Sequence, residues 1–382
     1  MKGWVVVMRL RTGLVAVFCG VLFLNSLPAM AAETPGISSL SAVVYEPESG
    51  LVLYEKDGDT ARPMASTTKL MTALLAAEKL SPEATVRVPA KALPVEGSQV
   101  GLAAGEETTV RDLLAGLLLA SGNDTANALA LLMADSLPAF AGMMNEKAAQ
   151  LGMTNSLFVT PSGLDEGGHS ASARDMALLG AAVLKQPVLA ELCASKTASV
   201  TYGGRRMTLK NHNKLLSLTD DCIGLKTGFT KKSGRCLVSA VERDGITLVI
   251  ATLNGGDYWN DHLALYHYAF SLVERQLLSV QVQDTLPVAG GQKDSISLTV
   301  SPPEDVVTKA GEKITACVEL PRFVWAPVRA GETVGTVTWF CGDRPVAFGV
   351  ITAGETVDSR PVPTGWALWW RHVKQILTEL LR

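Results

Sequence analysis

The sequence predicts an α/β (α+β) fold in which strands from both ends of one domain form a single sheet with a cluster of helices inserted between them, followed by a small all-β domain and a C-terminal amphipathic helix. Residues 37–54 and 222–253 alternate apolar and polar side chains, as strands do. The segment between them repeats apolar residues at helical spacing. Beyond residue 278, short alternating runs are separated by Pro, Gly and Thr turns, which indicates short strands.

The composition is that of a globular protein with two folded units. The chain has 382 residues, of which 47% are hydrophobic and 19% charged. That length can bury a large core and is too great for one ordinary domain. The net charge is −3, and no basic run follows the N-terminus, so we predict no nucleic-acid partner.

The N-terminus has the pattern of a secretory signal peptide. Three basic residues precede an apolar run at 14–24, and the segment at 28–31, Pro-Ala-Met-Ala, ends in a small-x-small pattern. The alternative is an uncleaved N-terminal anchor, for which the apolar run is short. We therefore predict a signal peptide at 1–31 and an exported protein.

The first predicted domain covers residues 37–277. It opens with a hairpin whose strands lie at 43–45 and 50–54, joined by a Pro-Glu-Ser-Gly turn. The other expected elements are a helix after Ser66, a helix ending before Ser121, helices at 124–132 and 173–184, strands at 222–226, 236–242 and 247–253, and a helix at 261–277.

The second predicted domain, residues 278–360, is expected to be β-sandwich-like and carries no cluster of catalytic groups. Five cysteines follow the predicted signal peptide, an odd number that leaves at least one thiol unpaired. We do not expect Cys222 and Cys236 to form a bridge, because they are offset across a hairpin. Cys317 and Cys341 remain a candidate pair.

The last segment, residues 361–382, predicts an amphipathic helix. Its apolar stripe contains three tryptophans, and charged residues cover the other face. Such a helix is typical of one that lies in the membrane–water interface without spanning the bilayer. The alternative is a helix docked on its own β domain or on a partner. We favour the membrane surface because a large terminal apolar face rarely stays exposed to water.

Ser66 and Lys69 are the first candidate catalytic pair. Residues three apart on a helix are close neighbours, so Lys69 can reach the Ser66 hydroxyl. A serine becomes a good nucleophile when a base takes its proton, and a lysine can be that base if burial or a nearby positive charge lowers its pKa. Lys226 is a candidate for that charge. Taken alone, the motif fits equally a helix N-cap serine with an exposed lysine.

Ser121, Gly122 and Asn123 follow a leucine-rich helix. Gly122 permits a sharp turn that presents Ser121 and Asn123 to a cleft. Ser121 can relay a proton, and the Asn123 amide can bind a peptide group. In isolation, the same three residues fit an ordinary helix C-terminal turn.

Lys226, Thr227 and Gly228 end a predicted strand. Gly228 would let an extended substrate lie along the strand edge, and Lys226 with Thr227 can bind a carboxylate. The backbone N–H groups of Phe229 and Ser66 can form an oxyanion hole. The alternative is an ordinary strand end with a solvated lysine.

Together, the three segments are the Ser-x-x-Lys, Ser-x-Asn and Lys-Thr-Gly elements of the β-lactamases and penicillin-binding proteins. The chain resembles the D-alanyl-D-alanine carboxypeptidases, the low-molecular-mass penicillin-binding proteins. Arg-Pro-Met-Ala at 62–65, Gly-Leu-Asp at 163–165 with His169, and Asn-His-Asn-Lys at 211–214 also resemble that family. So does the layout of export signal, first domain, β domain and terminal helix.

The resemblance implies a serine β-lactamase/transpeptidase-like catalytic domain and no cofactor or metal. It implies a carboxypeptidase that removes the terminal D-alanine from peptidoglycan stem peptides in cell-wall biogenesis and remodelling, with β-lactam antibiotics as acylating inhibitors. The protein would act at the outer face of the cytoplasmic membrane. The catalytic residues would be Ser66 as nucleophile, Lys69 as general base and Ser121 as proton relay. The substrate-binding residues would be Asn123, Lys226, Thr227, Gly228 and Phe229.

Two alternative functions would share part of this pattern. A class A-like β-lactamase would carry a glutamate for deacylation, and no Glu-x-x-Leu-Asn segment follows Asn123. A catalytically silent peptidoglycan-binding protein would not need Ser66, Lys69 and Lys226 intact. The sequence contains no Gly-x-Ser-x-Gly elbow, which disfavours a Ser-His-Asp hydrolase, and no His-Glu-x-x-His, which disfavours a metallo-carboxypeptidase.

Overall fold

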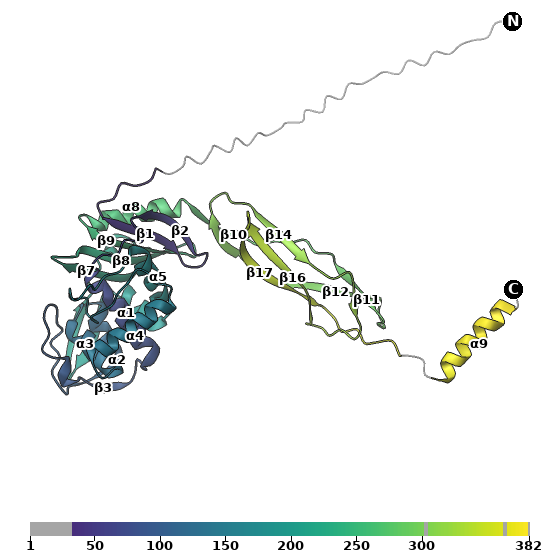
Figure 1. The fold of residues 1–382 in the computed structure, drawn as a ribbon, viewed down its shortest axis with the longest axis horizontal. Coiled ribbons are helices and arrows are strands. Elements are labelled where there is room, and N and C mark those ends of the chain that lie inside the picture. Colours follow the sequence, from purple (N-terminus) through teal and green to yellow (C-terminus); the bar gives the residue numbers. More distant parts are fainter. Residues whose placement is uncertain (1–32, 302–304, 362–364, 381–382) are drawn as a thin grey trace, which may run out of the picture. The chain divides into compact units, whose positions relative to one another are not determined.

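The computed structural model describes residues 33–301, 305–361 and 365–380 (Figure 1). The predicted signal peptide at 1–31 lies outside the described residues. The central sheet has five antiparallel strands in the order β2-β1-β9-β8-β7. Their bounds are β1 (Ser41–Glu46), β2 (Leu51–Lys56), β7 (Cys222–Thr230), β8 (Gly234–Arg243) and β9 (Ile246–Gly255).

The opening hairpin joins the late strands directly, because β1 pairs with β9. Strands from the two ends of the first predicted domain therefore pair in one sheet, as the sequence predicts. Strand β7 is at the edge of this sheet, so within the described part of the chain one side of its backbone has no strand partner. The helices and short strands between β2 and β7 are α1 (Lys69–Lys79), β3 (Thr85–Arg87), β4 (Glu107–Thr109), α2 (Val110–Leu118), α3 (Asn123–Met133), α4 (Leu137–Gln150), α5 (Ala173–Leu184), α6 (Pro187–Ala194), β5 (Thr197–Tyr202), β6 (Arg205–Lys210) and α7 (Leu215–Leu218).

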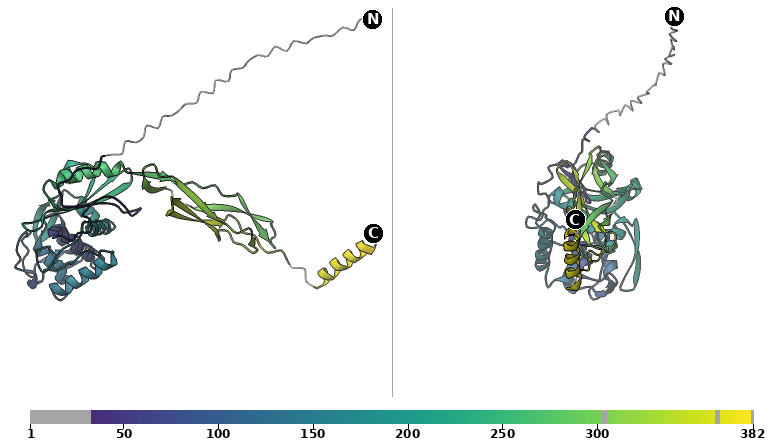
Figure 2. Two further views of the ribbon diagram at one scale, coloured as in Figure 1. Left: turned by 45° about the horizontal axis from the view of Figure 1, so that its top comes forward. Right: turned by 90° about the vertical axis from the view of Figure 1, so that its right-hand side faces the viewer.

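The two faces of the sheet bury different sets of side chains. Successive residues of a strand point to opposite faces. Val43 accordingly joins the core shared with α1 and α5, whereas Ala42 and Val44 join the core beneath α8 (Tyr258–Phe270). Figures 1 and 2 show α8 on one side of the sheet and α5 with the other helices on the opposite side. At Gly180 a Cβ would lie 2.8 Å from Val249, so the glycine permits close packing of α5 on the sheet.

The prediction of a helix over 261–277 is wrong in its last part. Helix α8 ends at Phe270, and β10 (Val273–Leu277) follows and pairs with β13 (Asp305–Lys309). Arg275 of β10 donates to Asp305 of β13 at 2.5 Å. Pairing with a distant strand overrides the helical pattern of this segment, as tertiary context often does.

The C-terminal domain is all-β, as predicted. Its larger sheet has six strands in the order β14-β16-β17-β12-β11-β15. Trp339 is fully buried in one of its two apolar clusters and donates its indole N–H to the Ser279 carbonyl at 3.0 Å. The strand bounds are β11 (Thr285–Ala289), β12 (Ser295–Ser301), β14 (Ile314–Glu319), β15 (Val324–Trp325), β16 (Thr333–Cys341) and β17 (Arg344–Ala353).

The candidate disulfide between Cys317 and Cys341 is not formed. Strands β14 and β16 pair so that Cys317 is opposite Thr338, while Cys341 is opposite Ile314. The two thiols thus belong to different rungs of the ladder. All five cysteines of the described residues are free, including Cys222 and Cys236, for which no bridge was expected.

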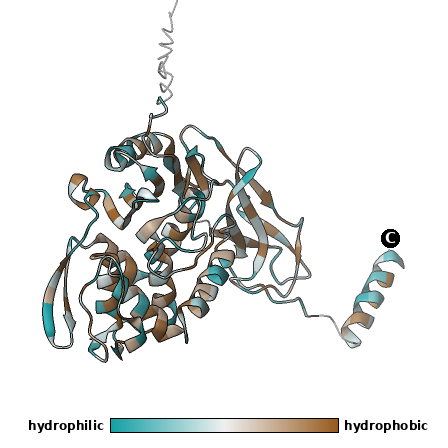
Figure 3. Ribbon diagram, turned by 60° about the vertical axis from the view of Figure 1, so that its left-hand side comes forward, coloured by the Kyte–Doolittle hydropathy of each residue, from teal (hydrophilic) through white to brown (hydrophobic). Residues whose placement is uncertain are grey.

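Helix α9 (Trp366–Leu380) carries polar and apolar side chains around its circumference (Figure 3). The rings of Trp366, Trp369 and Trp370 lie close together, with centroids 5.5 to 6.1 Å apart. Among the described residues, no single helix is both long and apolar enough to cross a membrane. Two bent helix pairs, α3 with α4 and α5 with α6, reach that criterion by length and composition alone.

Candidate active site

The candidate nucleophile lies in a tight turn at the start of α1. Residues Ala65–Thr68 form one turn of 3-10 helix, and Ala65 has a φ of 49°, a left-handed conformation. The Thr67 hydroxyl donates to the Met64 carbonyl at 2.6 Å, and the Thr68 hydroxyl donates to the Ala65 carbonyl at 2.7 Å. These bonds fix the backbone around Ser66. The N-cap of α1 is Thr68, so the alternative in which Ser66 is an N-cap serine is wrong.

Lys69 lies against the Ser66 hydroxyl and is fully buried. Its Nζ is 2.9 Å from Ser66 Oγ, 2.7 Å from Asn123 Oδ1 and 2.6 Å from the Ser162 carbonyl. Burial, and secondly the positive charge of Lys226, hold the pKa of Lys69 well below its usual value. A neutral amine can keep its N–H bonds for the two carbonyl-type oxygens and turn its lone pair toward Ser66.

Ser121 lies in the turn between α2 and α3, and Asn123 is the first residue of α3. The left-handed residue of this turn is Ser121, with φ 60°, whereas Gly122 has φ −59°. The sharp turn expected at Gly122 therefore takes its left-handed angle from Ser121. A glycine is needed at position 122 because a Cβ there would lie 2.7 Å from side-chain oxygens of Asp124 and Thr125.

Asn123 connects Lys69 to the neighbouring loop. Its Oδ1 accepts from Lys69, and its Nδ2 donates to the Glu96 carbonyl at 2.6 Å. The next residue, Asp124, accepts backbone N–H groups of residues 100–102 at 2.9 to 3.2 Å. The start of α3 therefore holds this loop beside the lysine.

Strand β7 brings the third motif to the nucleophile. At Gly228 a Cβ would lie 2.9 Å from the Ser66 and Thr67 backbone nitrogens. Gly228 thus allows the turn that carries Ser66 to pack closely against β7. From the sequence, Gly228 was considered only for the approach of a substrate to the strand edge. The Ser66 N–H lies beside β7, where Phe229 follows Gly228, and the oxyanion hole of these two N–H groups stays a prediction.

Lys226 points away from the solvent. It is 1% exposed, and its Nζ donates to the Thr227 carbonyl at 3.0 Å. Burial lowers its pKa to about 8. Thr227 lines the cavity in front of Ser66 and Lys226 does not, so a direct contact of Lys226 with substrate stays a prediction.

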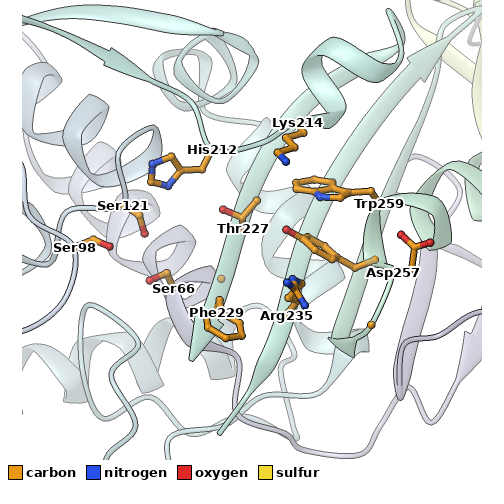
Figure 4. A pocket seen from close by; sticks show the side chains of 13 residues that line it. Ser66, Ser98, Ser121, His212, Lys214, Thr227, Phe229, Arg235, Asp257 and Trp259 are labelled. Atoms are coloured by element: carbon orange, nitrogen blue, oxygen red, sulfur yellow. The ribbon is translucent and has the colours of Figure 1, made fainter. Parts of the chain in front are cut away.

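The cavity in front of Ser66 has a volume of about 520 Å³ (Figure 4). Five of the candidate site residues line it, namely Ser66, Ser121, Thr227, Gly228 and Phe229. The other lining residues were not assigned a role from the sequence and are Ser98, His212, Lys214, Arg235, Gly256, Asp257, Tyr258 and Trp259. The Asn-His-Asn-Lys segment at 211–214 was a usable signal for two of them. Arg235 and Trp259 belong to no motif and reach the cavity through the sheet and α8.

The loop at 160–169 supports the nucleophile turn from behind. At Gly163, with φ 86°, a Cβ would lie 2.0 Å from the Ala65 carbonyl oxygen. His169 Nδ1 accepts the Val159 N–H at 2.9 Å, which leaves its Nε2–H to bond the Thr68 hydroxyl at 2.7 Å. Burial lowers the pKa of His169 to about 4, which keeps the ring neutral.

Neither a metal-binding cluster nor a glutamate bonded to Ser66 or Lys69 occurs among the described residues. No group of three or more His, Cys, Asp or Glu side chains suited to a metal occurs in the described part of the chain. His262 is buried and bonded to Ser239 and Thr252. Glu166 lies in the 160–169 loop with an exposed side chain that contacts neither Ser66 nor Lys69 through a described hydrogen bond.

Comparison with known proteins agrees with this geometry. Residues 28–256 match the model of the D-alanyl-D-alanine carboxypeptidase family, and residues 278–359 match that of the penicillin-binding protein 5 C-terminal domain. The D-alanyl-D-alanine carboxypeptidase DacF of Bacillus subtilis is 32% identical over 340 residues, which are 83% of this chain and 87% of that protein. DacA of Escherichia coli is 30% identical, over 93% of this chain and 90% of that protein.

Solved structures are similar as well. Penicillin-binding protein 5 of Haemophilus influenzae has a TM-score of 0.65 at 25% identity, over 85% of this chain and 99% of that one. A D-alanyl-D-alanine carboxypeptidase of Mycobacterium tuberculosis has a TM-score of 0.61 at 34% identity, over 64% of this chain and 96% of that one. The chain therefore belongs to the D-alanyl-D-alanine carboxypeptidase family of low-molecular-mass penicillin-binding proteins.

Proposed function

We propose that this protein is a serine-type carboxypeptidase that removes the terminal D-alanine from peptidoglycan stem peptides. The observation that carries the proposal is the contact between a fully buried Lys69 and the Ser66 hydroxyl at 2.9 Å, with Thr227 in the same cavity. Such a contact supplies a nucleophile with its base already in hydrogen-bond reach. Family membership supports the same reaction.

Acylation follows from this geometry. Ser66 Oγ attacks the carbonyl carbon of the penultimate D-alanine, and its proton passes to Lys69 Nζ. The carbonyl oxygen gains negative charge, for which the Ser66 and Phe229 N–H groups are the proposed donors. The C–N bond then breaks, and the departing nitrogen receives a proton from Lys69, with Ser121 as the proposed relay. Free D-alanine leaves, and the substrate remains as an ester on Ser66.

Deacylation returns the enzyme to its first state. Water attacks the ester carbonyl, the C–Oγ bond breaks, and Ser66 recovers its proton. Among the described contacts of Ser66 Oγ, Lys69 is the basic group. The absence of a glutamate in contact with Ser66 or Lys69 within the described residues favours this route over that of a class A-like β-lactamase.

Substrate binding uses the edge of β7 and the charges around it. An extended peptide can add to the free edge of β7 as a further strand, with Asn123 on its other side. Its terminal carboxylate would then reach Thr227, with the positive charge of Lys226 behind. Lys214 and Arg235 line the same cavity and add to the positive field.

A β-lactam antibiotic would acylate Ser66 in the same way, because its amide carbonyl takes the place of the scissile one. The decisive assay is the release of D-alanine from diacetyl-Lys-D-Ala-D-Ala by the purified protein, together with covalent labelling by a fluorescent penicillin. Both activities are expected to disappear in Ser66→Ala. Labelling that persists in Ser66→Ala would contradict the assignment of the nucleophile.

We also propose that the protein is exported by the signal peptide at 1–31 and rests on the outer face of the cytoplasmic membrane through α9. The three tryptophans of α9 are 49 to 73% exposed, which supports an apolar face available to a lipid surface. Deletion of residues 366–382 is expected to move the protein to the soluble fraction. Unchanged membrane association would refute the anchor and favour the alternative, in which α9 of the full chain docks on its own β domain or on a partner.

A further inference from the structure

Two aromatic side chains of the β domain, Phe323 and Trp325, point out of the fold. Phe323 is 44% exposed, and Trp325 of β15 is 72% exposed. Val324 lies between them and packs on the apolar cluster that contains Leu286. Because successive residues of a strand point to opposite faces, Phe323 and Trp325 share the outer face. We call these two side chains the outer aromatic pair.

The outer aromatic pair has a basic neighbour. The two rings contact each other, with centroids 5.3 Å apart and planes at 82°. Arg322 precedes Phe323, is exposed and forms no ion pair with another described residue. Three other basic side chains at this end of the domain are neutralised by carboxylates, in the pairs Lys293–Glu355, Arg329–Asp358 and Arg360–Asp294. Arg322 therefore adds an uncompensated positive charge beside two exposed rings.

The pair lies close to the point where the chain leaves the β domain toward α9. Trp325 is opposite Ala289, the last residue of β11. The turn that follows β11 also binds the last described residues of the domain, since the Gly290 carbonyl accepts the Arg360 N–H at 2.8 Å. Ser359 forms a β-bridge with the next residue of the same turn. One turn thus contacts both the strand of Trp325 and the start of the segment that leads to α9.

The length of that segment limits how far the pair can be from α9. Trp366, the first residue of α9, is the sixth residue after Arg360. An extended chain advances by at most about 3.6 Å per residue, so Arg360 and Trp366 are separated by no more than roughly 22 Å. If α9 lies on a lipid surface, this end of the β domain is held near the same surface.

The chemistry of the pair suits a lipid surface better than a sugar chain. Tryptophan is enriched where a protein meets the headgroups of a bilayer, and a basic residue beside it is attracted by anionic lipids. A sugar ring stacks on a flat aromatic face with polar side chains around it. Here the rings are nearly perpendicular. The polar cavity at Gln281 and Gln283 has neither Phe323 nor Trp325 in its lining.

We propose that Arg322, Phe323 and Trp325 form a second membrane contact, in which the two rings enter the headgroup region of an anionic bilayer and the guanidinium binds lipid phosphate. The proposal rests on the proposed anchoring by α9 and goes beyond it. It implies that the β domain is held against the membrane at two places, which restricts its orientation more than a tether at α9 alone would.

The first test measures how the full chain partitions onto vesicles of phosphatidylglycerol and phosphatidylethanolamine by sedimentation. The double variant Phe323→Ser, Trp325→Ser is expected to partition about tenfold more weakly, because two apolar rings no longer enter the interface. Arg322→Gln should lose about fivefold on these vesicles and nothing on vesicles of phosphatidylcholine.

The matched control is Phe348→Ser, which should partition like the wild type. Phe348 is 69% exposed on β17, and β12 and β11 separate that strand from β15. Thermal midpoints report whether each variant is folded. Release of D-alanine is expected to be the same in all of them, because none of these side chains lines the cavity in front of Ser66.

The second test locates Trp325 directly by fluorescence. Trp366, Trp369 and Trp370 are replaced by phenylalanine, which keeps the apolar face of α9 and removes its tryptophan emission. Vesicles with brominated acyl chains should quench the remaining emission, and adding Trp325→Phe should abolish that quenching. Trp339 is fully buried and supplies an emission that the lipids cannot reach.

Each outcome decides between the occupants of this surface. Equal partitioning of the wild type and the folded double variant, or no quenching of Trp325 on vesicles that bind the protein, would overturn the second contact and leave the α9 anchor intact. A shift of Trp325 emission with soluble peptidoglycan fragments in place of vesicles would overturn it in favour of a glycan site. A wild-type dimer that dissociates in the double variant would overturn it in favour of a second copy of the chain. If the wild type does not bind vesicles at all, the α9 anchor fails as well.

Discussion

The nucleophile turn and strand β7 each contribute one buried lysine, and the two lysines have different surroundings. Lys69 is bonded to three oxygens, one of which is the Ser66 hydroxyl. Lys226 has one described partner, the backbone carbonyl of Thr227. Burial lowers the pKa of both. The first lysine is thus placed to exchange a proton with the nucleophile, while the second is placed to act through its charge.

This difference explains why the two lysines have to be near each other. A positive Lys226 disfavours a second positive charge at Lys69, and Asp124 acts in the opposite sense. Lys226 of β7 therefore lowers the pKa of Lys69 on α1, and the reaction needs both lysines. Each of the following predictions separates a contribution of the turn from a contribution of the strand.

The largest effect is expected at Lys69. Lys69→Ala removes the group that accepts the Ser66 proton, and loss of a general base costs about 10²- to 10⁴-fold in rate. The measurement is the second-order rate constant of penicillin acylation by stopped-flow fluorescence.

The control for this variant is Lys79→Ala at the other end of α1, which should acylate like the wild type. An acylation rate of Lys69→Ala within tenfold of the wild type would show that another group activates Ser66, and the contrast between the two lysines would be lost.

The next effect is expected where the strand meets the turn. In Gly228→Ala the new methyl group would lie 2.9 Å from the Ser66 and Thr67 nitrogens, and backbone atoms cannot move aside as a flexible side chain would. Overpacking of this kind costs about 1–3 kcal/mol. If the displacement falls on Ser66, acylation slows by roughly 10- to 100-fold.

The matched variant is Gly142→Ala on α4, where a Cβ meets no atom within 4 Å. It should leave acylation unchanged, and an exposed helical site should tolerate it well. A Gly228→Ala protein with normal acylation and normal kcat/KM would mean that the strand does not position the nucleophile.

The sequence predicts those parts of the site best whose residues are close together along the chain. The contact between Ser66 and Lys69 could be predicted because helical spacing alone brings the two side chains together. A sharp turn was predicted at Gly122, but its left-handed angle belongs to Ser121, and Gly122 instead leaves room for the side-chain oxygens of Asp124 and Thr125. That packing was not visible in the sequence.

Contacts made by sheet pairing were the least predictable. Arg235 reaches the cavity because β8 pairs with β7 so that Arg235 is opposite Phe229, and no motif marks that register. The strand at 273–277 was missed for the same reason, since its partner begins at Asp305. The five-stranded sheet itself was predictable, because β1, β8 and β9 are continuous runs of buried, mostly apolar residues, as strands covered on both faces are.

The smallest effect concerns the charge of Lys226 and appears in the pH dependence. The positive charge of Lys226 lowers the pKa of Lys69, so its removal in Lys226→Met should raise that pKa and keep Lys69 protonated to higher pH. Because only the neutral amine accepts the Ser66 proton, the acid limb of kcat/KM should move toward higher pH, with a loss of kcat/KM at a fixed pH on that limb. Lys226→Arg retains the charge and should leave the acid limb where it is, even if KM changes through altered carboxylate binding. A limb that stays in place in Lys226→Met, or moves equally in both variants, would show that Lys226 acts on the substrate alone and that burial by itself sets the basicity of Lys69.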